Sequence, residues 1–194
     1  MRRLHRQPLL AVAVLAVLGI ACSSATPTAT PGVDQMGQTV LRYQGPEIEA
    51  VIGYRYASQN LGDEWLIVDL AVTAAGGDSV KIDRSRIFVR PPGGDAVYLP
   101  SQEEFAAAYG SLRSTITRAA VAADPLDYFK PRRECDLKFF AEPGVELVFP
   151  QTWVDDRRVC SERLFFPIPG GVQAGNWVFG VDLTESKVRI PFKL

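Results

Sequence analysis

Two cysteines, Cys135 and Cys160, are the residues of the chain best able to do covalent chemistry after export. Each follows an arginine pair, in Arg-Arg-Glu-Cys and Arg-Arg-Val-Cys. An exported pair most simply forms a disulfide, because the compartment is oxidising. For a loop of about 25 residues, the chain-entropy model gives roughly 3 kcal/mol of stabilisation. Thiol redox catalysis is the alternative, because flanking arginines lower a thiol pKa, but no Cys-x-x-Cys motif is present.

Acidic residues lie close to both cysteines, as Glu134/Asp136 and Asp155/Asp156. Two converging carboxylates could hydrolyse a glycoside by acid–base chemistry. The chain has 22 acidic residues, so some fall together by chance, and an ion-paired surface is the simpler interpretation. The Asp-x-Asp-x-Asp-Gly loop of calcium sites and the glycine-rich phosphate loop are absent. We therefore expect no metal site, no cofactor and no catalytic residue.

The composition excludes several other classes of function. The only histidine is His5, which removes Ser-His-Asp and Cys-His nucleophiles and the usual imidazole ligands of zinc and copper. Loss of residues 1–21 would remove three of the 21 basic residues, leaving 18 against 22 acidic ones. This net negative charge gives no indication of the basic surface that binds nucleic acid.

The first residues are typical of an export signal. Met1–Gln7 is basic, and Leu9–Ile20 is apolar. Twelve helical residues span about 18 Å, which is short of the roughly 30 Å hydrocarbon layer of a membrane. A basic start, a short apolar run and small residues before a cysteine are the pattern of a cleaved signal peptide.

The segment Leu18-Gly19-Ile20-Ala21-Cys22 resembles bacterial lipoprotein signals. The resemblance implies a signal peptide over residues 1–21, with Cys22 receiving diacylglycerol and becoming the mature N-terminus. The protein would then be extracytoplasmic and lipid-anchored to a bacterial membrane. The family favours leucine three residues before the cysteine, where this chain has Gly19. Ordinary cleavage after Ala21 and an uncleaved anchor remain alternatives.

Residues 22–37 are rich in serine, threonine and proline, which cannot build a core. We expect a flexible tether there, and one folded domain over residues 38–194. In that domain, Asp63–Thr73 is the predicted central strand, with apolar residues at period two: Leu66, Val68, Leu70 and Val72. Ile48–Tyr56 has the same period, and Trp177–Leu183 with Val188–Leu194 predicts an antiparallel hairpin. Short strands separated by turns predict a mainly β, antiparallel β-sandwich.

The chain is similar to the immunoglobulin-like (telokin-like) domain of uncharacterised bacterial lipoproteins. The similarity rests on three stretches: the aromatic-led strand Trp65–Val72, the strand and glycine turn of Ile87–Gly94, and the closing Gly175–Leu194. It implies a fold and an envelope location, and it supplies no catalytic residue. The turn after the central strand, Ala74-Ala75-Gly76-Gly77, departs from the polar turn of the family.

One segment breaks the β pattern. Ser101 and Glu104 fit a capping box, and an apolar stripe follows at helical spacing, made of Phe105, Tyr109, Leu112 and Ile116. We expect an inserted amphipathic helix over about 102–120, packed on the sheet face that carries Trp65 and Ile67. Aromatic residues also crowd into 135–166, and the sequence leaves open whether they form core or a ligand site.

These observations predict a lipid-anchored envelope protein whose β-sandwich is a binding or accessory module for a protein or glycan partner. The alternative is an extracytoplasmic enzyme, either a carboxylate-based hydrolase or a thiol oxidoreductase. A cleft with two converging carboxylates would favour the hydrolase, and a solvent-accessible Cys135–Cys160 pair would favour the oxidoreductase. A shallow aromatic patch would favour the binding module.

Overall fold

The computed structural model describes residues 30–129, 132–144 and 147–194. The expected signal peptide, residues 1–21, and the expected lipidation site, Cys22, lie outside the described residues. Within the described part of the chain, no helix is long and apolar enough to cross a membrane.

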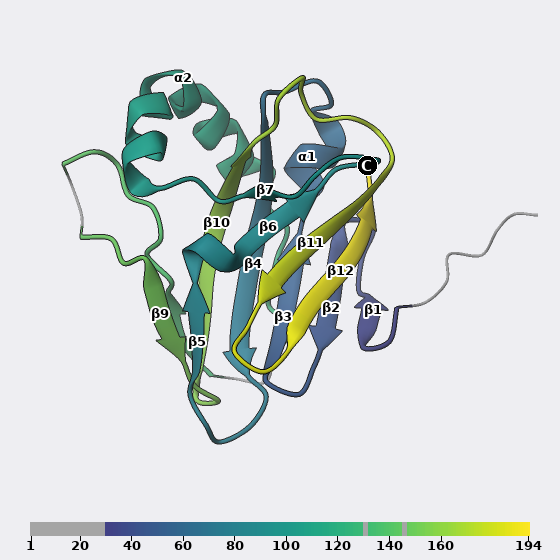
Figure 1. The fold of residues 1–194 in the computed structure, drawn as a ribbon, viewed down its shortest axis with the longest axis vertical. Coiled ribbons are helices and arrows are strands. Elements are labelled where there is room, and N and C mark those ends of the chain that lie inside the picture. The colour runs from purple at the N-terminus through teal and green to yellow at the C-terminus, as the bar shows by residue number, and fades with distance from the viewer. Residues whose placement is uncertain (1–29, 130–131, 145–146) are drawn as a thin grey trace, which may run out of the picture.

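The largest sheet has six strands in the order β1-β2-β3-β4-β10-β8 (Figure 1). Their bounds are β1 Val33–Gln35, β2 Val40–Gln44, β3 Ile48–Gly53, β4 Trp65–Ala74, β8 Arg133–Asp136 and β10 Arg158–Pro167. Every neighbouring pair is antiparallel except β8 and β10, which run parallel. The expectation of a purely antiparallel sheet was therefore wrong at this edge. The chain between β8 and β10 is long enough to return to the same end before it pairs.

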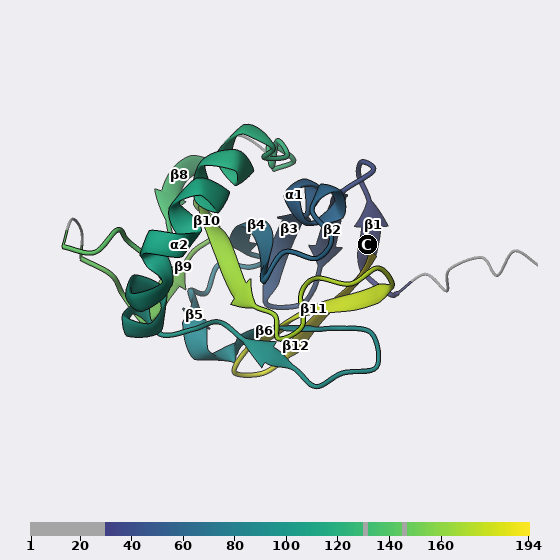
Figure 2. The ribbon, with the colours of Figure 1, turned by 90° about the horizontal axis from the view of Figure 1, so that it is seen from above.

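A second sheet has the order β12-β11-β6-β7, and β5 pairs with β9 as a two-stranded ribbon. The bounds are β5 Val80–Asp83, β6 Ile87–Arg90, β7 Val97–Tyr98, β9 Gln151–Val154, β11 Asn176–Asp182 and β12 Lys187–Lys193, with a 3-10 turn η1 at Arg84–Arg86. The predicted C-terminal hairpin is confirmed by the pairing of β11 with β12. Seen from above, the second sheet lies over one face of the first (Figure 2). The mainly β prediction is confirmed, and the immunoglobulin-like connectivity stays a prediction.

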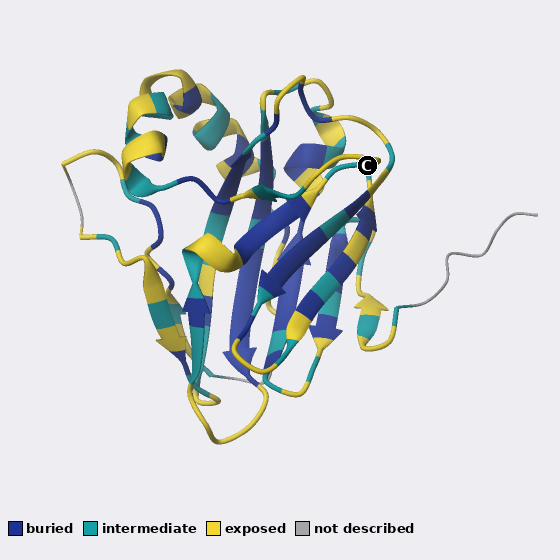
Figure 3. Ribbon diagram, viewed as in Figure 1, coloured by how far each residue is buried: buried dark blue, intermediate teal, exposed yellow. Residues whose placement is uncertain are grey.

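The core lies between these two sheets and follows the period of β4. Leu66, Val68, Leu70 and Val72 are all at most 1% exposed. Figure 3 shows buried residues along most of β3 and β4 and in the middle of β11. The Tyr54 ring, just after β3, lies 5.0 Å from the Phe192 ring of β12 and joins the two sheets. Burial of these apolar side chains is the main force that holds the layers together.

The inserted helix, α2, spans Gln102–Val121, one residue beyond the expected end. Its capping box is present, because Ser101 Oγ accepts from Glu104 N at 3.1 Å and Glu104 accepts from Ser101 N at 2.7 Å. Phe105 and Leu112 are buried, and Tyr109 and Ile116 lie half-buried at the margin. The Phe105 ring lies 5.1 Å from Phe165 of β10. Since Phe165 is the register partner of Ile67, α2 covers the outer face of the large sheet, as expected.

Two expected boundaries differ from the structure. The strand predicted to reach Tyr56 ends at Gly53, and a short helix, α1, follows at Arg55–Gln59. The large sheet also starts earlier than expected, because β1 lies within the segment assigned to the tether. Pairing at an edge strand needs backbone hydrogen bonds rather than a row of apolar side chains. A composition argument therefore does not detect β1.

Candidate binding groove beside the disulfide

The structure contains the disulfide expected between Cys135 and Cys160. The two residues are direct register partners on the parallel strands β8 and β10, with their Cα atoms 4.3 Å apart. Cys160 is only 1% exposed and Cys135 is half-buried. The pair therefore joins an edge strand to the body of the sheet, with one sulfur deep in the core.

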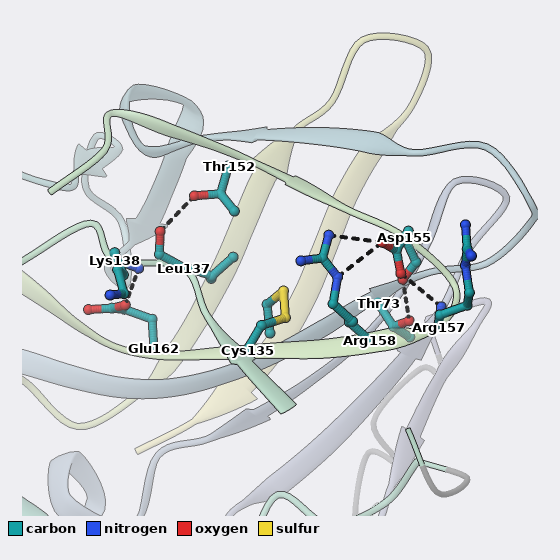
Figure 4. The surroundings of a disulfide bond; sticks show 10 residues. Thr73, Cys135, Leu137, Lys138, Thr152, Asp155, Arg157, Arg158 and Glu162 are labelled. Carbon is teal, nitrogen blue, oxygen red and sulfur yellow. Dashed lines mark hydrogen bonds and ion pairs between the residues drawn. A yellow bond between two sulfur atoms is a disulfide. The ribbon is translucent and has the colours of Figure 1, made fainter. Parts of the chain in front are cut away.

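The acidic cluster at Asp155/Asp156 forms a turn rather than a reactive pair. The Asp155 carboxylate accepts from Arg157 N at 2.9 Å and from Arg158 Nε at 3.0 Å (Figure 4). Its backbone carbonyl accepts from Thr73 Oγ1 at 3.1 Å. The hydrogen bond from Arg158 holds the pKa of Asp155 below its usual value. These contacts fix the connection between β9 and β10.

The other acidic pair, Glu134 and Asp136, lies on β8 and borders a groove. Two adjoining cavities, of about 520 and 620 Å³, run along the sheet beside the segment that follows α2. They share Leu126 and Ser161 in their walls. The register pairs Val159 with Glu134 and Ser161 with Asp136, so these four side chains share one face of the sheet. That face is the one opposite to the disulfide.

An ion pair between neighbouring strands lies in the first cavity. Arg163 Nε donates to Asp69 Oδ1 at 2.8 Å, and the two residues are register partners on β10 and β4. Burial raises the pKa of Asp69, and the charge and hydrogen bond of Arg163 oppose that rise. Both side chains are about four-fifths buried, with exposed fractions of 21% and 17%. The pair is thus a fixed polar feature of the wall, with a donor and an acceptor already oriented.

The segment that forms the other wall is anchored by Asp124, which is 6% exposed. Its carboxylate accepts from Arg55 Nη2 at 2.8 Å, from Thr39 Oγ1 at 3.0 Å and from Arg55 N at 3.2 Å. A Cβ atom at Gly53 would lie 2.9 Å from the Asp124 Cβ atom, so glycine permits this close approach. Asp124 therefore holds the chain after α2 against β2, β3 and α1.

Glu162 is the fourth acidic residue of the first cavity, after Asp69, Asp124 and Asp136. Its carboxylate accepts from Lys138 N at 2.8 Å (Figure 4). Burial raises the pKa of Glu162 to about 7, and the nearby charge of Asp136 adds to that rise, while backbone hydrogen bonds oppose it. At neutral pH this carboxyl exchanges a proton readily.

Sequence reasoning found the disulfide, interpreted the Glu134/Asp136 cluster as ion-paired surface, and missed Asp69, Asp124, Glu162 and Arg163. Asp69 and Arg163 lie 94 positions apart, and Arg55 and Asp124 lie 69 apart, so no local spacing reveals either pair. One usable signal existed: Asp69 is a charged residue in the middle of an apolar strand, where an unpaired charge is costly.

The aromatic-rich half divides between core and surface. Phe139 and Phe166 are fully buried, and Phe140 and Phe165 pack beside Phe105 under α2. Trp153 on β9 is 58% exposed. Among the described residues, no group of acidic, cysteine or histidine side chains is arranged to hold a metal ion.

No family model and no curated protein sequence matches the chain. Among solved structures, the chain is similar to YcdA, a candidate lipoprotein from Bacillus subtilis subsp. subtilis str. 168, with 11% sequence identity and a TM-score of 0.38. The match covers 81% of this chain but 38% of YcdA, so the chain spans well under half of that protein. A likeness at this score carries no conclusion about the fold, location or activity of this chain.

Proposed function

We propose that the chain is a non-enzymatic binding module of the bacterial cell envelope, anchored through a lipid on Cys22, and that the groove beside β8 and β10 holds an extended segment of a partner protein. The observation that carries this proposal is the pair of adjoining cavities with shared walls. Each cavity has a volume in the range of ligand pockets, about 300–1,000 Å³. Together they offer a path rather than a single enclosed pocket.

The chemistry of the walls favours a polypeptide over a neutral ligand. Acidic and basic side chains alternate along the groove with apolar ones, among them Arg132, Glu134, Asp136, Lys138 and Phe140. A peptide presents both signs of charge and apolar side chains at a spacing of a few ångströms. Preformed pairs such as Asp69–Arg163 favour recognition, because their donors and acceptors are held in place before a partner arrives.

The second candidate function is the carboxylate-based hydrolase. One observation favours it: Glu162, with a pKa of about 7, lines the same cavity as Asp69 and Asp136. A glycosidase needs one protonated and one ionised carboxyl group. Against it, Glu162 is held by Lys138 N, and Asp69 is held by Arg163, so neither is free to meet a substrate. Hydrolysis of glycosides by the parent and not by Glu162→Gln would support this alternative.

The thiol oxidoreductase has less support. A catalytic disulfide must admit an attacking thiolate. Cys160 is 1% exposed, and Cys135 is only partly accessible. The pair fits a structural crosslink better than a redox centre.

The test of the groove uses a soluble form that starts at Ser23, mixed with bacterial envelopes from the producing organism and sedimented. Ser161 is exposed in the floor of both cavities, so Ser161→Trp fills the groove. We expect Ser161→Trp to weaken binding by at least about tenfold, the equivalent of about 1.4 kcal/mol. Protease treatment of the envelopes should remove the share of binding that Ser161→Trp loses, whereas muramidase treatment should leave that share intact.

The matched control is Ser114→Trp, which adds the same indole at an exposed position of α2 outside the groove. It should bind like the parent. Equal binding by the two tryptophan variants would contradict the groove as the binding surface. Loss of binding after muramidase instead of protease would replace the protein partner with a glycan.

A further inference from the structure

A second cleft, of about 450 Å³, lies at the end of the molecule away from α2. Four parts of the chain form it: the β2–β3 turn, the loop from β4 to β5, the β11–β12 turn and the β5–β9 ribbon. Figure 1 shows these connections gathered at the lower end of the view, and Figure 3 shows that most of their surface is exposed. Loops gathered at one end of a rigid β scaffold are a common place for recognition.

Trp153 is the main apolar feature of this cleft. Its side chain is 58% exposed, whereas Trp177 in the core is fully buried. Trp153 is the register partner of Lys81, so the two side chains stand next to each other on one face of the β5–β9 ribbon. An indole offers a large flat surface and one N–H donor, which suits a ligand with an apolar face and a polar rim.

Polar groups of several kinds surround the indole. The cleft is lined by acceptor, hydroxyl and donor side chains: Glu47, Asp78, Glu185, Ser79, Thr184 and Lys81. The Ser186 hydroxyl donates to the Glu47 carboxylate and so holds it in position. Carboxylates only accept, an ammonium only donates and hydroxyls do both. The set therefore matches a ligand whose own groups both donate and accept.

We propose that this cleft binds a saccharide, with the sugar ring stacked on Trp153 and its hydroxyl groups bonded to the surrounding carboxylates, hydroxyls and Lys81. A pyranose ring has C–H groups on one face and a rim of hydroxyls, each of which donates and accepts. A cationic ligand fits less well, because Lys81 stands beside the indole and repels it. An anionic membrane surface fits less well too, because three carboxylates border the same cleft.

The saccharide site goes beyond the proposed groove and is independent of it. Ser161 lines the groove and takes no part in the Trp153 cleft. Filling the groove with Ser161→Trp should therefore leave saccharide binding unchanged. Loss of the envelope partner and loss of sugar binding can then be told apart.

The test is a titration of the full mature protein, in detergent micelles, with chitotetraose and with maltotetraose. Binding is followed by tryptophan fluorescence and calorimetry. We expect saturable binding of at least one tetrasaccharide. Trp153→Ala should weaken it by at least about tenfold, because the stacking surface is lost, and Trp153→Tyr should restore part of it. Because Trp153 is exposed, the denaturant midpoint of both variants should match the parent.

Tyr98→Ala is the matched control, since Tyr98 is 49% exposed but lies on β7, away from the cleft. It should bind the tetrasaccharide like the parent. Failure of both tetrasaccharides to bind would overturn the proposal. So would equal binding by Trp153→Ala, or saturable binding of choline in their place.

Discussion

At the residue scale, the carboxyl group of Glu162, in the wall of the groove, makes the stability of the protein depend on pH. The ordinary pKa of a glutamate carboxyl is 4.5, whereas the pKa of Glu162 in the folded protein is about 7, because burial disfavours the ionised form. Between these two values the folded protein holds a proton that the unfolded chain has released. The free energy of unfolding therefore falls as pH rises from about 4.5 to about 7, and it levels off above that range.

This dependence gives the first prediction. Glu162→Gln keeps an oxygen that can accept from Lys138 N but cannot ionise. The variant should lose the part of the slope between pH 4.5 and about 7 that Glu162 causes, and above pH 7 it should be more stable than the parent by up to about 3 kcal/mol. Urea unfolding at a series of pH values measures both effects.

Glu142→Gln is the control for that experiment, because Glu142 is exposed. It should keep the slope of the parent. If the free energy of unfolding of Glu162→Gln and of the parent depends on pH in the same way, the raised pKa of Glu162 is contradicted.

At the element scale, α2 is the cover of the outer sheet face, and Leu112 is 1% exposed within it. Leu112→Ala should lower the free energy of unfolding by about 2–5 kcal/mol, because it removes buried methyl groups and leaves a cavity. Denaturant unfolding measures the change.

The matched variant is Ser114→Ala, two positions away on the exposed side of α2. Its effect should stay within about 0.5 kcal/mol. A near-neutral Leu112→Ala would mean that α2 does not cover the sheet in solution, and the helix would then become a candidate for binding a partner.

The same elements show what the sequence can and cannot predict. Period-two apolar runs identified β4 and the β11–β12 hairpin, and the Ser101/Glu104 pair marked the start of α2. These signals are local, because a strand or a helix places neighbours along the chain on one face. The parallel pairing of β8 with β10 and the groove depend on contacts between distant segments. Such contacts leave no period in the sequence.

The short helix α1 illustrates the same limit. Residues 48–56 read as one strand, but Asp124, from a distant segment, accepts from Arg55 N where β3 ends. The backbone N–H of Arg55 therefore bonds to a side chain from a distant segment rather than to a neighbouring strand. Propensity and pattern cannot anticipate this outcome.

At the scale of the whole molecule, the disulfide ties the edge strand β8 to the sheet across a separation of 25 residues. Replacing both cysteines, as Cys135→Ala/Cys160→Ala, should lower the free energy of unfolding by roughly 3 kcal/mol, because the unfolded chain is then less constrained. Guanidine unfolding with and without reductant measures the loss. Reductant should destabilise the parent and leave the double variant unchanged; a parent that is insensitive to reductant would contradict the structural role.

The attachment of the molecule to a membrane gives the last prediction. If Cys22 carries the lipid, Cys22→Ala should move from the detergent-requiring membrane fraction to the soluble fraction, since stable anchoring needs more than one acyl chain. Fractionation of cells that produce each form checks this. A variant that stays in the membrane fraction as firmly as the parent would contradict lipid anchoring.

The crosslink also decides what a protease can separate. The polypeptide between Cys135 and Cys160 contains the exposed side chains of Leu147 and Phe149, with exposed fractions of 73% and 44%. Chymotrypsin cleaves after leucine, so the Leu147–Val148 bond is the expected cut, whereas the Phe149–Pro150 bond resists cleavage because proline follows. Exposed loops are the usual sites of nicking. A single cut there opens the backbone but leaves both fragments on one covalent framework. On a denaturing gel the nicked protein should run as one band without reductant and as two bands with it. The disulfide would then be the covalent link between the fragment with α2 and the fragment with β11.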